Sequence, residues 1–240
     1  MTELFNLQGK RAFVTGKTGL LAPIWKETLE AAGCEVMSYG LPDGDVLDRD
    51  HLSRIAVDYT PDIIVNNAAW DSPPTSGATF WADFEAMIAI NLTGAKNVCE
   101  SFLPGMIRDG GGVIVNIGSI MGYGAADYRN YDPPFEKPLA YNLSKWALRG
   151  LSKSIAVQYG RYGIRCVTPS FGPYNGGKLP EPFLVKFLHN VPLVKQSFPP
   201  TDVRQCVSKR SLQQTLLYAV CCEDLTGQDW RIDGGLGSWA

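Results

Sequence analysis

Apolar residues along this chain fall into two patterns: short runs with little polar interruption, and longer stretches in which they recur every three or four positions. The short runs cover residues 11–15, 35–39, 62–69, 112–118, 164–168 and 229–232. Such runs are typical of parallel strands that are covered on both faces. The longer stretches cover residues 21–32, 84–108, 141–162 and 203–220, and they predict helices with one buried face.

Predicted strands and helices alternate from one end of the chain to the other. This alternation predicts an α/β fold with a doubly wound parallel sheet, the Rossmann fold, in a single domain over residues 1–240. In such sheets ligands bind at the carboxyl ends of the strands. Two stretches rich in Gly, Pro and aromatic residues, at about 122–138 and 170–200, are predicted to be irregular loops that cover this edge on the substrate side.

A glycine-containing turn follows the first predicted strand and leads into a helix. Its residues are Thr15, Gly16, Lys17, Thr18, Gly19, Leu20, Leu21 and Ala22. Glycines at such a turn let the backbone approach a pyrophosphate, whose charge then meets the start of the helix. A tight turn without a ligand is the alternative for this pattern. A Walker-type ATP loop is disfavoured, because the glycine it needs five residues earlier is replaced by Arg11.

The end of the second predicted strand bears on the choice of dinucleotide. It reads Ser38, Tyr39, Gly40, with neither the acidic residue of an NAD site nor the basic residue of an NADP site. Because no carboxylate is there to repel a 2′-phosphate and Lys17 is in the loop, the sequence slightly favours NADP(H); a solvated Lys17 is the alternative. Asp45 and Val46 are candidates to contact the adenine, and for Asp45 an ordinary turn role is equally open.

Three polar groups are predicted to meet at one edge of the sheet. Tyr141 and Lys145 are four residues apart at the start of a helix, so their side chains share one face. The ordinary pKa of tyrosine is about 10, and a nearby cation favours the phenolate, which suits proton exchange with a carbonyl or alcohol oxygen. Ser119 follows one strand and residues 66–69 end the preceding one. Ser119 can donate a hydrogen bond to a substrate oxygen or cap the strand end.

Together these motifs resemble the short-chain dehydrogenase/reductase family over nearly the whole chain. The resemblance is carried by Thr15, Gly16 and Gly19 of the loop, by Asn66, Asn67, Ala68 and Ala69, by Asn91 and Ser119, and by Tyr141 and Lys145. It implies hydride transfer between the nicotinamide of NAD(P)(H) and a substrate carbon. The implied cofactor-binding residues are Gly16, Lys17, Thr18, Gly19, Leu20, Leu21, Asp45, Val46, Asn67, Ala68, Ala69, Tyr141 and Lys145.

The resemblance also implies a catalytic tetrad, with all four positions intact. Tyr141 would be the general acid/base, and Lys145 would hold the nicotinamide ribose hydroxyls and lower the pKa of Tyr141. Ser119 would orient the substrate oxygen, and Asn91 would fix a water molecule in a proton relay.

The chain departs from the family pattern where the substrate would lie. Ser119 and Tyr141 are 22 positions apart, more than in typical members, which indicates an insertion. The insertion combines aromatic rings with charges: Tyr123, Tyr128, Arg129, Tyr131, Asp132, Phe135 and Lys137. Such a lining suits a polar ring with an anionic group. The RNYDP-like centre of the insertion also resembles short-chain reductases found with pathways for surface or flagellar sugars, and this resemblance implies a sugar or sugar nucleotide as the first choice of small-molecule substrate. A non-sugar ketone or secondary alcohol is the second, and simple packing of the aromatic residues is the structural alternative.

Two other function classes remain open at this point. A non-catalytic dinucleotide-binding sensor would be expected to lose Tyr141 or Lys145, which this chain retains. An epimerase or dehydratase is favoured by the short glycine loop, which is one residue shorter than the family's usual form. It is disfavoured by the short stretch after Lys145, because such enzymes resemble longer chains with a separate substrate domain.

The amino-acid composition limits the classes of partner that are expected for this protein. The net charge of −2, from 22 Lys and Arg against 24 Asp and Glu, argues against nucleic-acid binding. With neither a signal-peptide pattern nor a long apolar segment, a cytoplasmic protein without membrane attachment is expected. Six cysteines and two histidines form no zinc or disulfide signature, so no metal site is predicted. The family resemblance implies a homodimer or homotetramer, formed through the helices predicted at 84–108 and 141–162.

Overall fold

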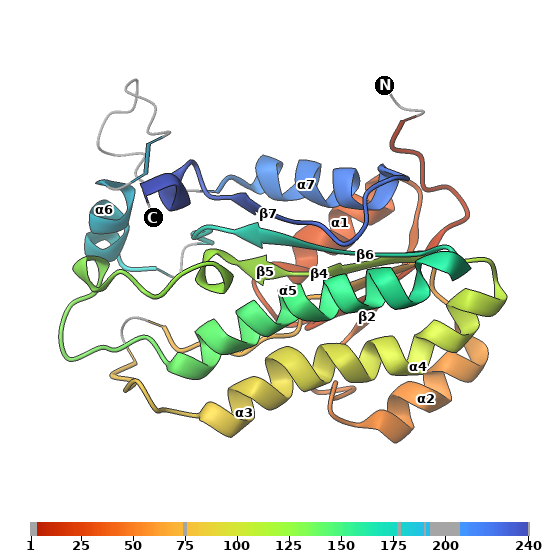
Figure 1. Cartoon of the computed structure of the whole chain (residues 1–240), viewed down its shortest axis with the longest axis horizontal. Helices are drawn as coiled ribbons and strands as arrows, with labels where there is room; N and C mark the ends of the chain where they lie inside the picture. Colours follow the sequence, from red (N-terminus) through yellow and green to blue (C-terminus); the bar gives the residue numbers. More distant parts are fainter. Residues whose placement is uncertain (1–3, 74–75, 177–178, 190, 193–206, 240) are drawn as a thin grey trace.

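A computed structural model describes residues 4–73, 76–176, 179–189, 191–192 and 207–239 (Figure 1). Within these residues seven strands form one parallel sheet in the order β2-β1-β3-β4-β6-β5, with β7 also paired to β6. The strands are β1 (Arg11–Thr15), β2 (Glu35–Tyr39), β3 (Ile63–Asn66), β4 (Gly112–Asn116), β5 (Gly118–Ser119), β6 (Ile164–Phe171) and β7 (Asp229–Ile232). The predicted parallel α/β sheet is confirmed.

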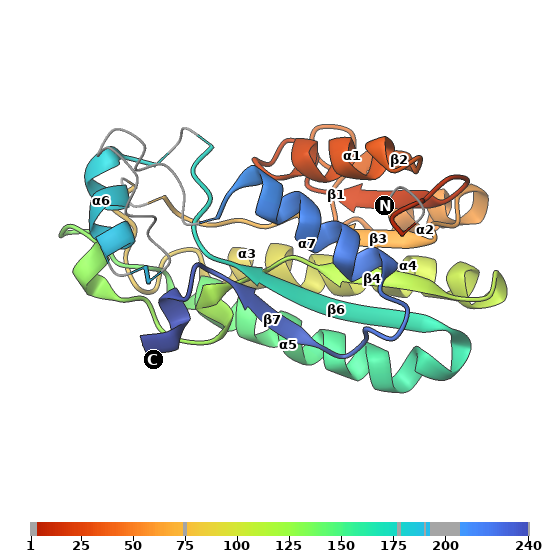
Figure 2. The same ribbon diagram turned by 90° about the horizontal axis from the view of Figure 1, so that it is seen from above.

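Helices cover both faces of this sheet (Figures 1 and 2). They are α1 (Ala22–Ala31), α2 (Arg49–Asp58), α3 (Phe84–Ile88), α4 (Gly94–Arg108), α5 (Leu139–Tyr159), α6 (Glu181–His189) and α7 (Lys209–Cys221). Helices α1 and α7 lie on one face, and α2, α4 and α5 lie on the other. Among the described residues no helix has both the length and the apolar character needed to span a membrane.

The two-sided core follows from the alternation of side chains along each strand. In β1, Val14 points to the α1 and α7 face and packs in one cluster with Trp25 and Leu212. Phe13 points to the opposite face, where its ring lies 4.5 Å from that of Phe102 in α4. All five side chains are buried, so β1 lies at the centre of the molecule with apolar layers above and below it.

Two helices were not predicted. Helix α2 has only one buried residue, Leu52, so its apolar pattern is weak. Helix α6 lies inside the segment 170–200 that was predicted to be an irregular loop, and there the prediction is wrong. Residues 177–178, 190 and 193–200 of that segment, and residues 203–206 of the helix predicted at 203–220, lie outside the described residues.

The helix predicted at 84–108 contains a short π-helical turn over Ala89–Thr93, between α3 and α4. Such turns inside α-helices occur frequently at functional sites because they change the direction of one side chain. Asn91 lies in this turn and is 1% exposed.

Strand β7 anchors helix α5 from a distant part of the chain. Asp229 begins β7 and is largely buried. Its carboxylate forms ion pairs with Arg149 and Lys153 of α5, the latter at 2.7 Å. Helix α5 is therefore fixed on its sheet side by the last strand as well as by its apolar face.

Candidate active site

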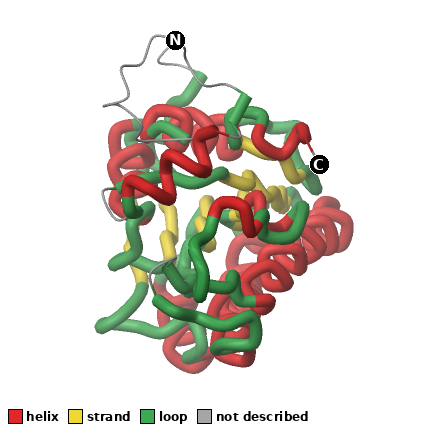
Figure 3. The backbone as a smooth tube through the Cα atoms, turned by 90° about the vertical axis from the view of Figure 1, so that its left-hand side faces the viewer, coloured by secondary structure: helices red, strands yellow, loops and turns green. Residues whose placement is uncertain are grey.

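The carboxyl ends of the strands, with the loops that follow them, face the viewer in Figure 3. At this edge the loop after β1 touches the segment after β3. The hydroxyl oxygen of Thr15 accepts hydrogen bonds from the backbone N–H groups of Asn67 and Ala68, each at 3.0 Å. Gly16 has a φ of +75°, and a Cβ there would lie 2.8 Å from the Cα of Ala68. Only glycine fits this position without displacing the backbone of residue 68.

The side chain of Asn67 locks the same junction. Its amide nitrogen donates to the carbonyl of Thr15 at 3.0 Å, and its amide oxygen accepts from the indole N–H of Trp25 at 2.8 Å. Asn67 therefore connects β1, β3 and α1. Ala68 is partly buried and Ala69 is exposed beside it.

The start of α1 lies where the phosphates of a dinucleotide are expected. Leu21 makes no side-chain cap, Pro23 has no N–H, and the Ile24 N–H donates to the carbonyl of Leu21 at 3.0 Å, so among the first three residues of α1 only Ala22 has a backbone N–H that could meet an anion. Gly19 turns the chain into this helix through a hydrogen bond to the carbonyl of Gly16 at 2.8 Å. Thr18 is exposed, and Leu20 is partly buried like Leu21. The predicted loop residues thus lie together around one helix N-terminus.

The expectation that no carboxylate lies near Lys17 is wrong. Its ammonium forms an ion pair with Asp43, which comes from the loop after β2. Sequence analysis missed this partner because it considered only residues 38–40 at the strand end. The pair removes part of the argument for a 2′-phosphate at this position, since the lysine charge is already compensated.

Asp45 and Val46 differ in what they offer a ligand. Asp45 accepts a hydrogen bond from the backbone N–H of Leu47 at 2.9 Å, the turn role that the sequence left open. Val46 is 5% exposed and packs in the core against Gly94 of α4. An adenine contact by either residue stays a prediction.

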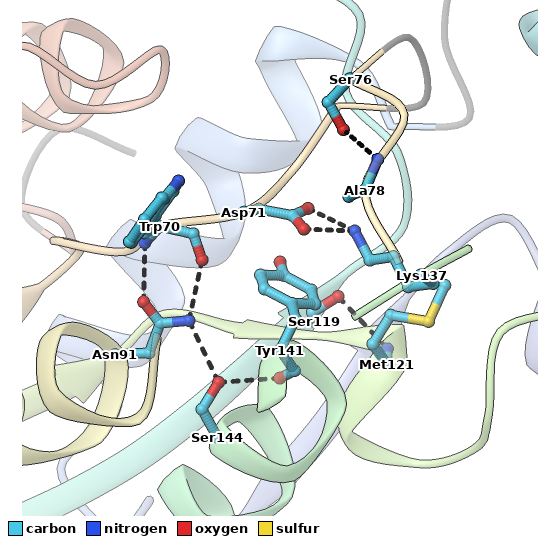
Figure 4. Close-up of polar contacts among 10 residues, drawn as sticks. All are labelled: Trp70, Asp71, Ser76, Ala78, Asn91, Ser119, Met121, Lys137, Tyr141 and Ser144. Carbon is cyan, nitrogen blue, oxygen red and sulfur yellow. Dashed lines mark hydrogen bonds and ion pairs between the residues drawn. The ribbon is translucent and has the colours of Figure 1, made fainter. Parts of the chain in front are cut away.

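Tyr141, Ser119 and Lys145 come together at the start of α5 (Figure 4). Tyr141 lies in the first turn of the helix and Lys145 in the next. The ammonium of Lys145 is buried, donates to the carbonyl of Ile117 at 2.8 Å, and lies 5.8 Å from the centroid of the Tyr141 ring. The Ser119 hydroxyl accepts from the backbone N–H of Met121 at 3.2 Å, the capping role, and it lies beside the Tyr141 ring.

The pKa of Tyr141 differs from the expectation. Burial, followed by the negative charge of Asp71, raises the pKa of Tyr141 well above its usual value, and the hydrogen bond with Ser119 only partly opposes this. The predicted lowering of this pKa by Lys145 is therefore not what this structure has. A phenol with a raised pKa keeps its proton at neutral pH, as a group that donates a proton to a carbonyl oxygen must do.

Burial also changes Lys145. It lowers the pKa of the ammonium to about 8, while the carboxylate of Asp71 opposes this shift and the charge of Lys137 adds to it. Lys145 is consequently a cation at neutral pH that loses its proton more easily than an exposed lysine.

Asn91 positions the tyrosine turn. Its amide oxygen accepts from the backbone N–H of Trp70 at 2.6 Å, and its amide nitrogen donates to the carbonyl of Trp70 at 3.0 Å and to the hydroxyl of Ser144 at 3.1 Å. Ser144 in turn donates to the carbonyl of Tyr141 at 2.7 Å. The side chain thus joins the loop after β3 to the first turn of α5 (Figure 4). Its role in holding a water molecule stays a prediction.

Two charged residues at this site have no counterpart in the predicted tetrad. Asp71 lies in the loop after β3, and Lys137 lies at the end of the insertion. The Lys137 ammonium is 2.5 Å from both oxygens of the Asp71 carboxylate and 4.2 Å from the centroid of the Tyr141 ring. Asp71 was not identified from the sequence, where the only signal is its position four residues after Asn67.

The insertion is held by aromatic packing. Tyr131 and Phe135 are buried against Phe183 and Phe187 of α6, with ring centroids 5.2 to 5.6 Å apart. Simple packing, the structural alternative, therefore accounts for Tyr131 and Phe135. Tyr128 is exposed.

A cavity of about 630 Å³ lies between the insertion, α6 and the segment after β7. It adjoins the tyrosine site, since Ile120 and Met121 directly follow Ser119. Its lining includes Tyr123, Arg129, Phe187 and Arg231. The cavity therefore offers apolar surface, the cation of Arg231 and an ion pair between Arg129 and Asp127, while Ser119 and Tyr141 lie outside its lining.

Comparison with known proteins decides the family. The family described as short chain dehydrogenase matches residues 45–175, more than half of the chain. This protein belongs to the short chain dehydrogenase family. An uncharacterized oxidoreductase of Thermotoga maritima is 30% identical over 185 residues, which are 72% of this chain and 66% of that protein, just under two thirds of its length.

Two further relatives cover this short chain dehydrogenase almost completely. The galactitol 2-dehydrogenase of Rhizobium johnstonii is 26% identical over 99% of this chain and 98% of its own. A solved structure of a gluconate 5-dehydrogenase from Burkholderia cenocepacia, in complex with NADP and tartrate, has a TM-score of 0.78 and 22% identity, with 99% and 98% coverage. The last similarity shows the fold.

Proposed function

We propose that this protein is an NAD(P)-dependent oxidoreductase that interconverts a carbonyl group and a secondary alcohol. The observation that carries the proposal is the Tyr141 phenol beside Ser119 (Figure 4), with Lys145 one turn further along α5. The glycine loop and the start of α1 lie at the same edge of the sheet and suit a dinucleotide.

The residues of the site divide the chemistry of carbonyl reduction among them. Tyr141, kept protonated by its surroundings, donates a proton to the carbonyl oxygen, and Ser119 donates a hydrogen bond to the same oxygen. The Lys145 ammonium lies 5.8 Å from the centroid of the tyrosine ring, and it would hold the nicotinamide ribose hydroxyls. When bound, a nicotinamide dinucleotide supplies or accepts the hydride. In the oxidation direction Tyr141 must first lose its own proton, and the phenolate then takes the proton from the alcohol.

A polyhydroxylated substrate, such as a sugar derivative, is our first choice. The cavity that begins at Ile120 carries Arg231 and the Arg129–Asp127 ion pair, and its size accommodates a small polar ring. The full-length similarity to a galactitol 2-dehydrogenase favours the same class. A simple ketone is the second candidate, because Ile120, Met121 and Phe187 line one part of the cavity with apolar surface.

Two finer features belong to the proposal. NADP(H) stays the slightly preferred cofactor because of Lys17, although Asp43 competes for its charge. Homo-oligomerisation would use α4 and α5, which border a shallow groove lined by Leu103, Ile107 and Leu151. Apolar surface of this kind is a common component of subunit interfaces.

Tyr141→Phe tests the function directly. The ring stays and only the transferable proton is lost, so we expect turnover to fall by at least about 1,000-fold while the dissociation constant of NAD(P)H stays within a factor of about two. Nicotinamide absorbance measures turnover against a panel of keto-sugars and simple ketones, and fluorescence titration measures cofactor binding. Unchanged activity would reject the acid/base assignment. An epimerase would return the cofactor unchanged, and a sensor would bind it without turnover.

A further inference from the structure

Asp71 and Lys137 form an ion pair at the candidate proton donor in which the two partners differ in exposure. The side chain of Lys137 is 8% exposed, whereas that of Asp71 is 39% exposed. Both carboxylate oxygens lie 2.5 Å from the ammonium. The lysine is thus buried behind the carboxylate, and the carboxylate keeps an open side toward solvent.

This pair lies at the reacting end of the site. The Lys137 ammonium is 4.2 Å from the centroid of the Tyr141 ring. Figure 4 shows the Asp71 carboxylate on the side of the ring that carries the hydroxyl group. The same Lys137 ammonium contacts both oxygens of Asp71, so the carboxylate lies close to the tyrosine ring.

Stability alone does not explain such a pair. Removing an ammonium from water costs free energy that one ion pair often fails to recover, so an apolar contact would stabilise this position at least as well. The pair also joins two segments that are far apart in the sequence, the loop after β3 and the insertion, and it does so next to Tyr141. This position favours a role at the site over a role in stability alone. An ionised pair that lines a candidate site and faces solvent on one side is suited to recognition.

We propose that Asp71, held in place by Lys137, determines specificity by accepting a hydrogen bond from a substrate hydroxyl group on the carbon next to the reacting carbonyl. The inference rests on the proposed function and names its substrate class: α-hydroxyketones in reduction, and vicinal diols in oxidation. A carboxylate has lone pairs beyond those that Lys137 occupies, and a hydroxyl group is the donor that fits them. An α-keto acid would place a second negative charge beside Asp71 and is disfavoured.

Lys137 acts as a positioning residue. Its ammonium contacts both oxygens of the carboxylate and fixes their position, so its effect on the substrate passes through Asp71. An arginine can make the same two contacts, and methionine has a similar length without the charge. Lys137→Arg should therefore retain selectivity that Lys137→Met loses.

The test compares two substrates that differ by one hydroxyl group, acetoin and 2-butanone, in NAD(P)H-dependent reduction. We expect the wild-type protein to favour acetoin in kcat/KM by at least about 10-fold, as for a charged hydrogen bond to substrate. The double variant D71A/K137M, which leaves no unpaired buried charge, should lower this ratio to about one, and the ratio is the readout because it compares the two substrates on the same variant. Lys137→Arg should keep most of the ratio.

Asp132→Asn is the matched control. It breaks another ion pair between the insertion and a lysine, Lys186 of α6, away from Tyr141, and should leave the acetoin preference unchanged. A wild-type ratio near one, or a ratio retained in D71A/K137M, overturns the inference. If the wild type reduces no carbonyl of a broad panel, the proposed function itself has failed. Thermal unfolding with cofactor plus 2,3-butanediol or 2-butanol then decides hydroxyl recognition by itself: stabilisation specific to the diol and lost in the double variant supports it, and equal stabilisation refutes it.

Discussion

The two sides of the candidate site are built in different ways. On the glycine-loop side, backbone N–H groups of residues 67 and 68 donate to the Thr15 hydroxyl, and Gly16 approaches the backbone of Ala68 too closely for any side chain. On the insertion side, Tyr131 and Phe187 belong to an aromatic cluster that packs the insertion against α6. The first side is fixed by main-chain geometry at the sheet edge, and the second by side chains between distant segments.

This difference implies that residues on the insertion side tolerate substitution better than residues on the glycine-loop side. A backbone-built site tolerates few substitutions, because the position of each main-chain group depends on its neighbours. A side-chain cluster can change its residues and keep its packing, so it can adapt to another substrate. We infer that mutations on the two sides affect cofactor binding and substrate use separately.

The largest effect is expected from Gly16→Ala. The added Cβ would lie 2.8 Å from the Cα of Ala68, which forces the loop away from residue 68. We expect the dissociation constant of NAD(P)H to rise on the order of 100-fold, as for a displacement of key groups by a fraction of an ångström. Gly9→Ala is the control, because Gly9 has a similar φ of +79° but open space around it. Equal losses in both variants would show that backbone strain alone is responsible.

The second prediction concerns Lys145, which lies between the two sides. Because its pKa is lowered to about 8 in the folded protein, the unfolded chain binds more protons between pH 8 and 10. The free energy of unfolding of the wild type relative to Lys145→Met should therefore rise by about 2 kcal/mol across this window. Urea unfolding of the cofactor-free proteins at both pH values measures it. A difference that falls or stays flat contradicts the lowered pKa.

A third, smaller effect is expected from Phe187→Ala on the insertion side. Phe187 is 3% exposed and packs against Phe183, so its loss loosens α6 and the cavity wall. The KM of the carbonyl substrate should rise by about 10-fold with cofactor affinity unchanged, through poorer substrate positioning. Val185→Ala, an exposed position on the same helix, should change neither value. Equal losses of substrate and cofactor binding would contradict the separation of the two sides.

The smallest effect is expected from Asp43→Asn. It releases Lys17 from an ion pair whose acidic partner is mostly exposed, and such pairs contribute little free energy. We expect the affinity for NADPH relative to NADH to rise by about 3-fold, because Lys17 becomes free to meet a 2′-phosphate. Glu27→Gln, which breaks the exposed pair with Lys209, should leave the ratio unchanged. A ratio unaffected by Asp43→Asn would remove Lys17 from the cofactor assignment.

Local sequence patterns predict those parts of the structure that depend on neighbouring residues, and they miss those that depend on long-range contacts. Strand β1 begins and ends at the predicted residues, because five consecutive strand-forming residues are followed directly by Gly16. The fold class followed from repeats of this local signal. Helix α6 was missed because it lies in a segment rich in Gly and Pro that resembles a loop.

The candidate site shows the same limit. Tyr141 and Lys145 share one helix, so their proximity is a matter of spacing, and the structure brings them together with Ser119. Asp71 and Lys137 are 66 residues apart and meet only through the tertiary fold. The pKa of Tyr141 depends on the position of Asp71 and on burial of the ring, and neither can be predicted from the charges of neighbouring residues in the sequence.

The ion pairs between Asp229 and helix α5 have a consequence for how the protein is made. A chain emerges from the ribosome in sequence order, and its earlier segments begin to fold first. Arg149 and Lys153 leave the ribosome long before Asp229. The ion pairs between α5 and Asp229 can therefore form only after β7 has been synthesised. A nascent chain that stalls before residue 229 would contain every residue of the proposed tetrad but would lack the two ion pairs that fix α5 to β7.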